Sequence, residues 1–247
     1  MKLLRSGLLL LALLGQALGL AQELRFAAPE YPPYTTEVDG QASGMAVALV
    51  EDIVQRAGMR MSVHIVPNYS RCVFEVSHQI ADGFFLGSRN AERDAVAVLS
   101  HPVLVNRWGW VSLKDGPEKP ATARAPSPTP VGVLLNTNPH IWLKDHGYSI
   151  TGTPTSSVSL VAMLDAGRFE MALVPELVFQ YALQQSNRKP ENYRITLHSQ
   201  QPFGIYLSKD FLRRHPDALA RINKAIDEAA GTASPPRTRR KPEPPRP

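Results

Sequence analysis

The sequence predicts an α/β protein of two lobes, each with a mainly parallel sheet flanked by helices. Short apolar runs that suit strands alternate with amphipathic stretches along nearly the whole chain. A proline-rich stretch at residues 115–130 interrupts this alternation, which then resumes. About 225 residues remain once the N-terminal segment is set aside, enough for two domains of moderate size.

The N-terminus has the pattern of an export signal peptide. Lys2 and Arg5 form a positive region, residues 8–14 contain only Leu and Ala, and residues 19–21 place small side chains before the expected cleavage site. The apolar run is shorter than a membrane span requires, and no cysteine follows it to carry a lipid. We therefore expect residues 1–21 to be removed on export.

The basic composition does not indicate a nucleic-acid-binding protein. The chain has a net charge of +5, but residues 22–230 carry a net charge of −1. The excess lies in the signal peptide and in the tail at residues 231–247, whose six prolines and lack of large apolar residues predict disorder. The body of the protein therefore has no overall basic field to attract phosphates.

Cysteine and histidine usage predicts neither a disulfide nor a metal site. Cys72 is the only cysteine, and its place in an apolar helical run predicts a small core residue rather than a catalytic thiol. The seven histidines are scattered without metal-ligand spacing, and no phosphate loop or nucleophile elbow is present. No metal, cofactor or catalytic residue is predicted.

The elements follow from periodicity and capping residues. Before the proline-rich stretch, strands are expected at 24–27, 61–66, 84–86 and 103–113, and helices at 43–57, at 70–80 with Ser70 as cap, and after Asn90. After it, strands are expected at 131–135, 148–151, 171–174, 193–198 and 203–207, and helices at 137–147, from Thr155 or Ser156 to 164, after Pro175, and at 211–230.

Five segments, in order, carry a resemblance to a known family. They are Tyr31-Pro-Pro-Tyr34, SGMAVALVEDIVQRAG at 43–58, ADGFFLGSRNAERDAVAVLSHPV at 81–103, VGVLLNT at 131–137 and DAGRFEMALVPE at 165–176. Together they resemble the family 3 extracellular solute-binding proteins, the receptors of polar amino-acid uptake systems. The resemblance covers residues 24–228, nearly the whole predicted mature chain.

This resemblance implies a type II periplasmic binding fold with a hinged cleft. Lobe 1 is then discontinuous, with residues 22–114 and 201–230, and lobe 2 spans residues 131–200, with the proline-rich loop at 115–130 between them. The resemblance further implies a monomer in the periplasm that binds a small carboxylated solute, most simply an amino acid or close analogue. The expected partner is an ABC permease in the inner membrane.

Arg93 is the leading candidate for the ligand carboxylate. A guanidinium presents a rigid fork that matches the two oxygens of a carboxylate. In the family an Arg at this place holds the ligand α-carboxylate, although the spacing from Asp82 leaves Arg89 as an alternative. Thr137 would add its hydroxyl and the free amides of a helix N-terminus.

The remaining candidates line the expected cleft. Tyr31 and Tyr34 would form a stiff aromatic wall for the ligand side chain, and backbone groups at Gly87 and Ser88 could approach the ligand closely. Tyr69 and Arg71 stand where some family members place an aromatic residue and an Arg.

The acid that would hold an α-ammonium group is missing from its expected place. Many family members have an Asp at the position that is Pro175 here, and the adjacent Glu176 is a possible substitute. Two alternative functions share the fold. One is a receptor that senses a ligand without transport, and the other is a cyclohexadienyl-type dehydratase, for which Glu176 would be the general acid.

Overall fold

The structure is a computed structural model that describes residues 23–118 and 127–233. In these residues nine strands form one sheet, in the order β4-β1-β5-β11-β7-β10-β8-β9, with β6 paired to β11. The strands are β1 Glu23–Pro29, β4 Arg60–Val66, β5 Gly83–Gly87, β6 Ala97–Leu99, β7 Leu104–Leu113, β8 Ser127–Val133, β9 Tyr148–Gly152, β10 Met171–Pro175 and β11 Tyr193–Ser208. A separate hairpin consists of β2 Thr36–Val38 and β3 Gln41–Ser43.

The sheet is parallel at both ends and antiparallel in its centre. β1 pairs parallel with β4 and β5, and β8 pairs parallel with β9 and β10. Between these ends, β11 runs antiparallel to β5 and β7, and β7 runs antiparallel to β10. The predicted α/β class is confirmed, and the antiparallel centre is an addition to the expected parallel sheets.

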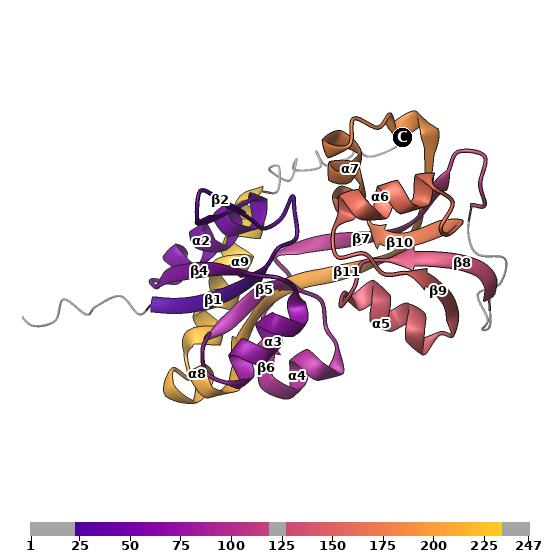
Figure 1. Ribbon diagram of the computed structural model, residues 1–247. Coiled ribbons are helices and arrows are strands. Elements are labelled where there is room, and N and C mark those ends of the chain that lie inside the picture. Colours follow the sequence, from indigo (N-terminus) through magenta and orange to yellow (C-terminus); the bar gives the residue numbers. More distant parts are fainter. Residues whose placement is uncertain (1–22, 119–126, 234–247) are drawn as a thin grey trace, which may run out of the picture.

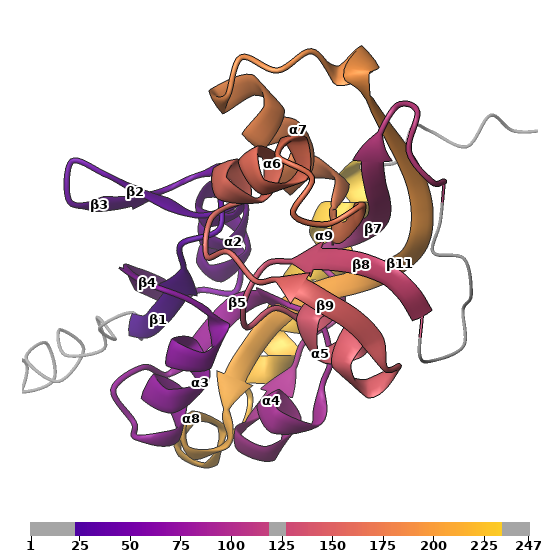
Figure 2. The ribbon, with the colours of Figure 1, turned by 45° about the vertical axis from the view of Figure 1, so that its right-hand side comes forward.

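The helices gather in two groups around the two ends of the sheet (Figure 1). They are α2 Met45–Arg56, α3 Tyr69–Ser77, α4 Ala91–Val96, α5 Asn138–Asp145, α6 Ser157–Asp165, α7 Glu176–Gln185, the 3₁₀ turn η1 Pro190–Asn192, α8 Lys209–Arg214 and α9 Ala218–Ala233. We call β1, β4, β5 and β6 with α2, α3, α4, α8 and α9 the first half. We call β8, β9 and β10 with α5, α6 and α7 the second half. The long strands β7 and β11 run between the halves in both views (Figure 1, Figure 2).

Strand alternation explains how the second half buries both faces of its sheet. Met171 and Leu173 of β10 belong to a small cluster with Trp108 and Trp110, and Trp142 of α5 packs against it. The intervening residues of β10 belong to the main core with buried residues of α6 and α7. Because successive side chains of a strand point to opposite faces, helices cover this end of the sheet on both sides.

One expected helix is split into two in the structure, and two expected strands are joined into one. The helix expected at 211–230 is two helices, α8 and α9, because Pro216 has no amide hydrogen to continue a helix and lies between them. The strands expected at 193–198 and 203–207 are one strand, β11, whose first part pairs with β7 and whose last residues pair with β5. A single long strand therefore connects the two halves.

Two expected boundaries also move. The cap of α3 is Asn68 rather than Ser70, because its side-chain oxygen accepts a hydrogen bond from the Arg71 amide over 3.1 Å. The end of the predicted loop at 115–130 belongs to β8, where the irregular register with β9 accommodates proline.

Several predicted segments lie outside the described residues. These are the signal peptide, half of the proline-rich loop and most of the C-terminal tail. The lobe boundaries and the hinge remain predictions. None of the described helices is long and apolar enough to span a membrane.

Candidate functional site

Adjoining pockets run along the boundary between the two halves, and Tyr69 lines three of them. The Arg93 pocket has a volume of about 10 Å³ and is lined by Tyr31, Tyr69, Leu86, Ser88, Arg93, Asn106, Trp108, Thr137, Asn138, Pro139 and Phe203. The wide pocket has a volume of about 390 Å³ and is lined by Pro29, Glu30, Tyr31, Pro67, Asn68, Tyr69, Leu134, Leu135, Asn136, Thr137, Thr155 and Ser156. Each pocket takes residues from both halves, which places the candidate site between them.

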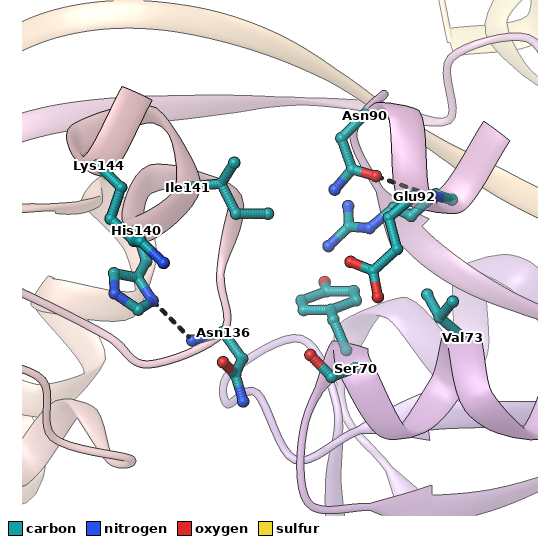
Figure 3. A pocket seen from close by; sticks show the side chains of 10 residues that line it. Ser70, Val73, Asn90, Glu92, Asn136, His140, Ile141 and Lys144 are labelled. Carbon is teal, nitrogen blue, oxygen red and sulfur yellow. Dashed lines mark hydrogen bonds between the residues drawn. The ribbon is translucent and has the colours of Figure 1, made fainter. Parts of the chain in front are cut away.

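A third pocket, the side pocket, lies on another side of Arg93 and has a volume of about 130 Å³. Figure 3 shows Ser70, Val73, Asn90 and Glu92 on one wall, facing Asn136, His140, Ile141 and Lys144 on the other. The amide of Asn136 donates to Nδ1 of His140 over 3.2 Å. Burial, and then the charge of Lys144, lower the pKa of His140, so its imidazole favours the neutral form.

Arg93 is a buried cation, with only 3 % of its surface exposed. Its Nη1 donates to the carbonyl oxygen of Ser88 over 2.7 Å, and its guanidinium lies 4.4 Å from the centre of the Tyr69 ring. No carboxylate of the described residues forms an ion pair with it. Burial lowers the pKa of Arg93, because the charged form of the guanidinium is less stable away from water. Such a group attracts an anion into the pocket.

The backbone around Arg93 is held in place by local capping. Asn90 is the cap of α4, and its Oδ1 accepts from the Arg93 amide over 2.8 Å. At the end of β5, Leu86 has a positive φ of 56°, a strained conformation for this residue type. The Leu86 carbonyl accepts from the Tyr69 hydroxyl over 2.6 Å, which fixes the ring beneath the guanidinium.

Thr137 lies where the sequence predicted, at the start of α5, and it is buried. Its hydroxyl donates to the Leu134 carbonyl over 2.7 Å and makes no capping bond to the helix. Thr137 therefore occupies the N-cap position without capping the helix through its side chain. The hydroxyl oxygen keeps lone pairs that can accept, and Asn138, the first residue of α5, lines the same pocket.

Asn138 connects the two halves across the Arg93 pocket, and the sequence pattern did not single it out. Its Nδ2 donates to Oγ of Ser88 over 2.6 Å and to the Ser88 carbonyl over 3.1 Å. Its Oδ1 accepts from Nδ2 of Asn90 over 2.7 Å. We call this set of bonds the Asn138 clasp. It holds the start of α5 against the residues that carry Arg93.

Two polar residues of β7, Asn106 and Trp108, also line the Arg93 pocket and were not predicted. Asn106 is 2 % exposed and Trp108 is 4 % exposed. Within the described part of the chain, Oδ1 of Asn106 and Nε1 of Trp108 are the buried side-chain polar atoms that lack a hydrogen-bond partner. A polar residue in alternation with the apolar residues Leu104 and Trp108 was the available signal for Asn106.

The predicted aromatic residues take different places. Tyr31 lines the Arg93 and wide pockets, and its ring stacks on Tyr34 at 6.0 Å and meets Tyr69 edge-on at 5.7 Å. Tyr34 lies behind it, outside the pocket linings, against Phe203. Burial raises the pKa of Tyr34 to about 12 and that of Tyr31 well above its usual value, so both stay protonated.

The other predicted residues are not all brought together. Ser88 lines the Arg93 pocket, whereas Gly87 is buried in β5 against the Tyr206 and Phe84 rings. Arg71 pairs with Glu75 on α3 over 2.8 Å and lines none of the pockets described above.

Glu176 and Arg89 are also separate from the Arg93 pocket. Glu176 at the start of α7 forms an ion pair with Arg107 over 2.7 Å. Arg89 pairs with Asp94 over 3.1 Å and is mostly exposed. The described residues contain no group of three acidic, His or Cys side chains that could hold a metal ion.

Comparison with solved structures identifies the class of fold. The holo form of ArgBP from T. maritima matches 84% of this chain and 90% of its own, with 18% identity and a TM-score of 0.67. A histidine kinase sensor domain similar to periplasmic binding proteins matches 86% and 92%, with 18% identity and a TM-score of 0.71. The GluR0 ligand-binding core from Nostoc punctiforme, in complex with L-glutamate, matches 85% and 93%, with 14% identity and a TM-score of 0.69.

The chain therefore has the fold of the amino-acid-binding proteins of the periplasmic binding type, as the motifs predicted. No family model matches the sequence. No curated protein matches it either.

Proposed function

We propose that this protein is an exported binding protein that captures a small carboxylated solute between its two halves and delivers it to an ABC permease. The observation that carries this proposal is Arg93, a buried guanidinium without a carboxylate partner among the described residues. A ligand carboxylate would supply the missing charge and accept two hydrogen bonds. The likeness to ArgBP and to the GluR0 core supports an amino acid or a close analogue.

The first test is a thermal-shift screen of the purified protein against amino acids, other monocarboxylates, dicarboxylates and short peptides. A ligand at a hundredfold excess over its Kd stabilises the folded state by about 2.7 kcal/mol, which gives a readily measured rise in Tm. Arg93→Ala should weaken binding of the best ligand by at least about a hundredfold, because a buried charge pair is lost. Arg188→Ala removes an exposed Arg paired with Asp165 and serves as the control.

Export is tested separately from binding. Expressed with its own N-terminus in a bacterium with two membranes, the protein should appear in the periplasmic fraction and lack residues 1–21 by mass spectrometry. A full-length protein in the cytoplasm would contradict the proposed location. A screen in which no carboxylate raises the Tm would contradict the proposed function.

A sensing role is the second candidate, and the likeness to a histidine kinase sensor domain favours it. The two roles share ligand capture and differ in the protein that detects the closed state. Deletion of the gene should abolish uptake of the radiolabelled ligand if the protein serves transport. Unchanged uptake with a lost transcriptional response would favour sensing. The dehydratase alternative has less support, since its candidate acid Glu176 is bound to Arg107 and does not line the Arg93 pocket.

A further inference from the structure

The Arg93 pocket is lined by one formally charged side chain, that of Arg93 itself. Its other polar side chains are neutral hydroxyl, amide and indole groups. Each adjoining pocket holds one acid. Glu92 of the side pocket shares that pocket with Lys144. The oxygens of Glu30 in the wide pocket already accept from the Thr36 hydroxyl over 2.6 Å and the Glu37 amide over 3.2 Å. A ligand with a single negative charge would therefore make the Arg93 pocket neutral overall.

This charge balance disfavours an α-amino acid. The ammonium group of such a ligand is attached to the carbon next to the carboxylate, so it must enter the pocket together with it. There it would lose water, lie near the like charge of Arg93 and find no anion among the lining side chains. Either orientation of the Asn106 amide offers it a neutral group only.

The two unpartnered atoms of β7 indicate what takes the place of the ammonium group. Oδ1 of Asn106 requires a donor, and Nε1 of Trp108 requires an acceptor. Asn106 and Trp108 are two residues apart on β7, so their side chains lie on the same face of the strand. Both line the Arg93 pocket. A hydroxyl group is both a donor and an acceptor and can satisfy both atoms, whereas a ketone can satisfy only Trp108.

We infer that the ligand is a 2-hydroxy monocarboxylate, whose carboxylate pairs with Arg93 and whose hydroxyl binds Asn106 and Trp108. This inference rests on the proposed function and names its substrate class. The narrow Arg93 pocket has room for about one water molecule, so only the carboxylate end of the ligand would lie there, and its walls must move apart to admit that end. The wide pocket, with Pro29, Pro67, Leu134 and Leu135 in its lining, then takes an apolar side chain.

Matched pairs of compounds test the inference with the full protein. The pairs are lactate and alanine, 2-hydroxy-4-methylpentanoate and leucine, and 3-phenyllactate and phenylalanine, with both enantiomers of each. Within a pair only the group at carbon 2 changes. In at least one pair the hydroxy acid should bind at least about tenfold more tightly than the amino acid by calorimetry, because the amino acid carries an unpaired ammonium into the pocket.

Two variants assign the preference to the named atoms. Asn106→Asp adds a carboxylate of nearly the same shape and should reverse the preference, improving amino-acid binding and weakening hydroxy-acid binding by about tenfold each. Trp108→Phe removes the indole donor and should weaken hydroxy-acid binding by about fivefold. Trp110→Phe is the matched control, since Trp110 lies on the same strand and in the same cluster but does not line this pocket.

The outcomes separate this inference from the proposed function. If the amino acids bind more tightly, or if only other carboxylates from the wider screen bind and Arg93→Ala abolishes their binding, the substrate class is wrong and the binding function stands. An unchanged preference in Asn106→Asp also overturns the inference. If no carboxylate binds at all, both proposals fail.

Discussion

Two buried charges in the first half of the molecule have opposite surroundings. Asp82 is 4 % exposed, and it accepts hydrogen bonds from Nε of Arg25 over 2.9 Å, from the Arg25 amide over 3.1 Å and from Arg214 over 3.3 Å. Arg93 is 3 % exposed and has a carbonyl and an aromatic ring as partners. The protein thus neutralises one buried charge internally and leaves the other without a carboxylate partner among the described residues.

The comparison separates structural from functional burial of charge. Asp82 joins the start of β1 to the segment before β5 and to α8, so its partners stabilise the fold of the first half. Arg93 lines pockets that also take residues from the second half. No carboxylate of the described residues pairs with it there. A buried charge without a protein counter-ion is therefore the better indicator of a binding site.

Replacing each charge by a neutral side chain is the strongest test of this contrast. Asp82→Asn should lower the free energy of unfolding by about 2–3 kcal/mol, because it leaves the guanidinium groups of Arg25 and Arg214 without their carboxylate. Arg93→Met should change it by less than about 1 kcal/mol, because a charge without a counter-ion is removed. Urea denaturation without ligand measures both values. Equal losses would make Arg93 a structural residue and refute the contrast.

The pH dependence of stability should also show the structural role of Asp82. Burial raises the pKa of Asp82, but the hydrogen bonds and charge of Arg25 outweigh it, so the pKa is lowered overall. The unfolded state then takes up the proton first, and stability present above about pH 4 is lost as the pH falls through the folded-state pKa. In Asp82→Asn, the free energy of unfolding should fall less steeply as the pH drops from about 5 to about 3, as measured by urea titrations. An unchanged slope would show that Asp82 does not contribute to it.

Local patterns were enough to predict most of the helices and strands. The spacing of apolar residues gave α2 and β4, and Asn90 and Ser156 cap α4 and α6 as expected. The β2–β3 hairpin was not predicted, although the Asp39-Gly40 pair, with φ values of 51° and 75°, is a typical hairpin turn.

The rest of the site depends on long-range packing that a single sequence does not encode locally. In the sequence, Asn138 is an ordinary residue in the first turn of a helix. It forms the bonds of the Asn138 clasp only because α5 lies against Ser88 in the fold. Glu176 was a candidate because it adjoins the position where the resemblance implies an Asp, but the antiparallel pairing of β10 with β7 brings it beside Arg107 instead. Which polar groups remain unpartnered is known only once every neighbour is in place.

The Asn138 clasp should affect the closed state more than the stability of either half. Asn138→Ala removes the bonds to Ser88 and Asn90, so the ligand should leave about fivefold faster in stopped-flow measurements, with little change in the free energy of unfolding. Asn223→Ala is the control, because it removes one comparable bond, to the His101 amide, far from the pockets. Equal effects of the two variants would mean that the clasp has no role in retaining ligand.

The smallest effect is expected at Glu176, the acid that the sequence offered as a partner for a ligand ammonium. Its ion pair with Arg107 lies outside the Arg93 pocket, and the Arg107 side chain is 47% exposed, so the pair contributes little net energy. Glu176→Gln should change the free energy of unfolding by less than about 1 kcal/mol and ligand affinity by less than about twofold. A large loss of affinity would move the anionic side of the site to α7 and reopen the case for an amino-acid ligand. An unaltered affinity would leave Arg93 as the charge on which ligand capture depends.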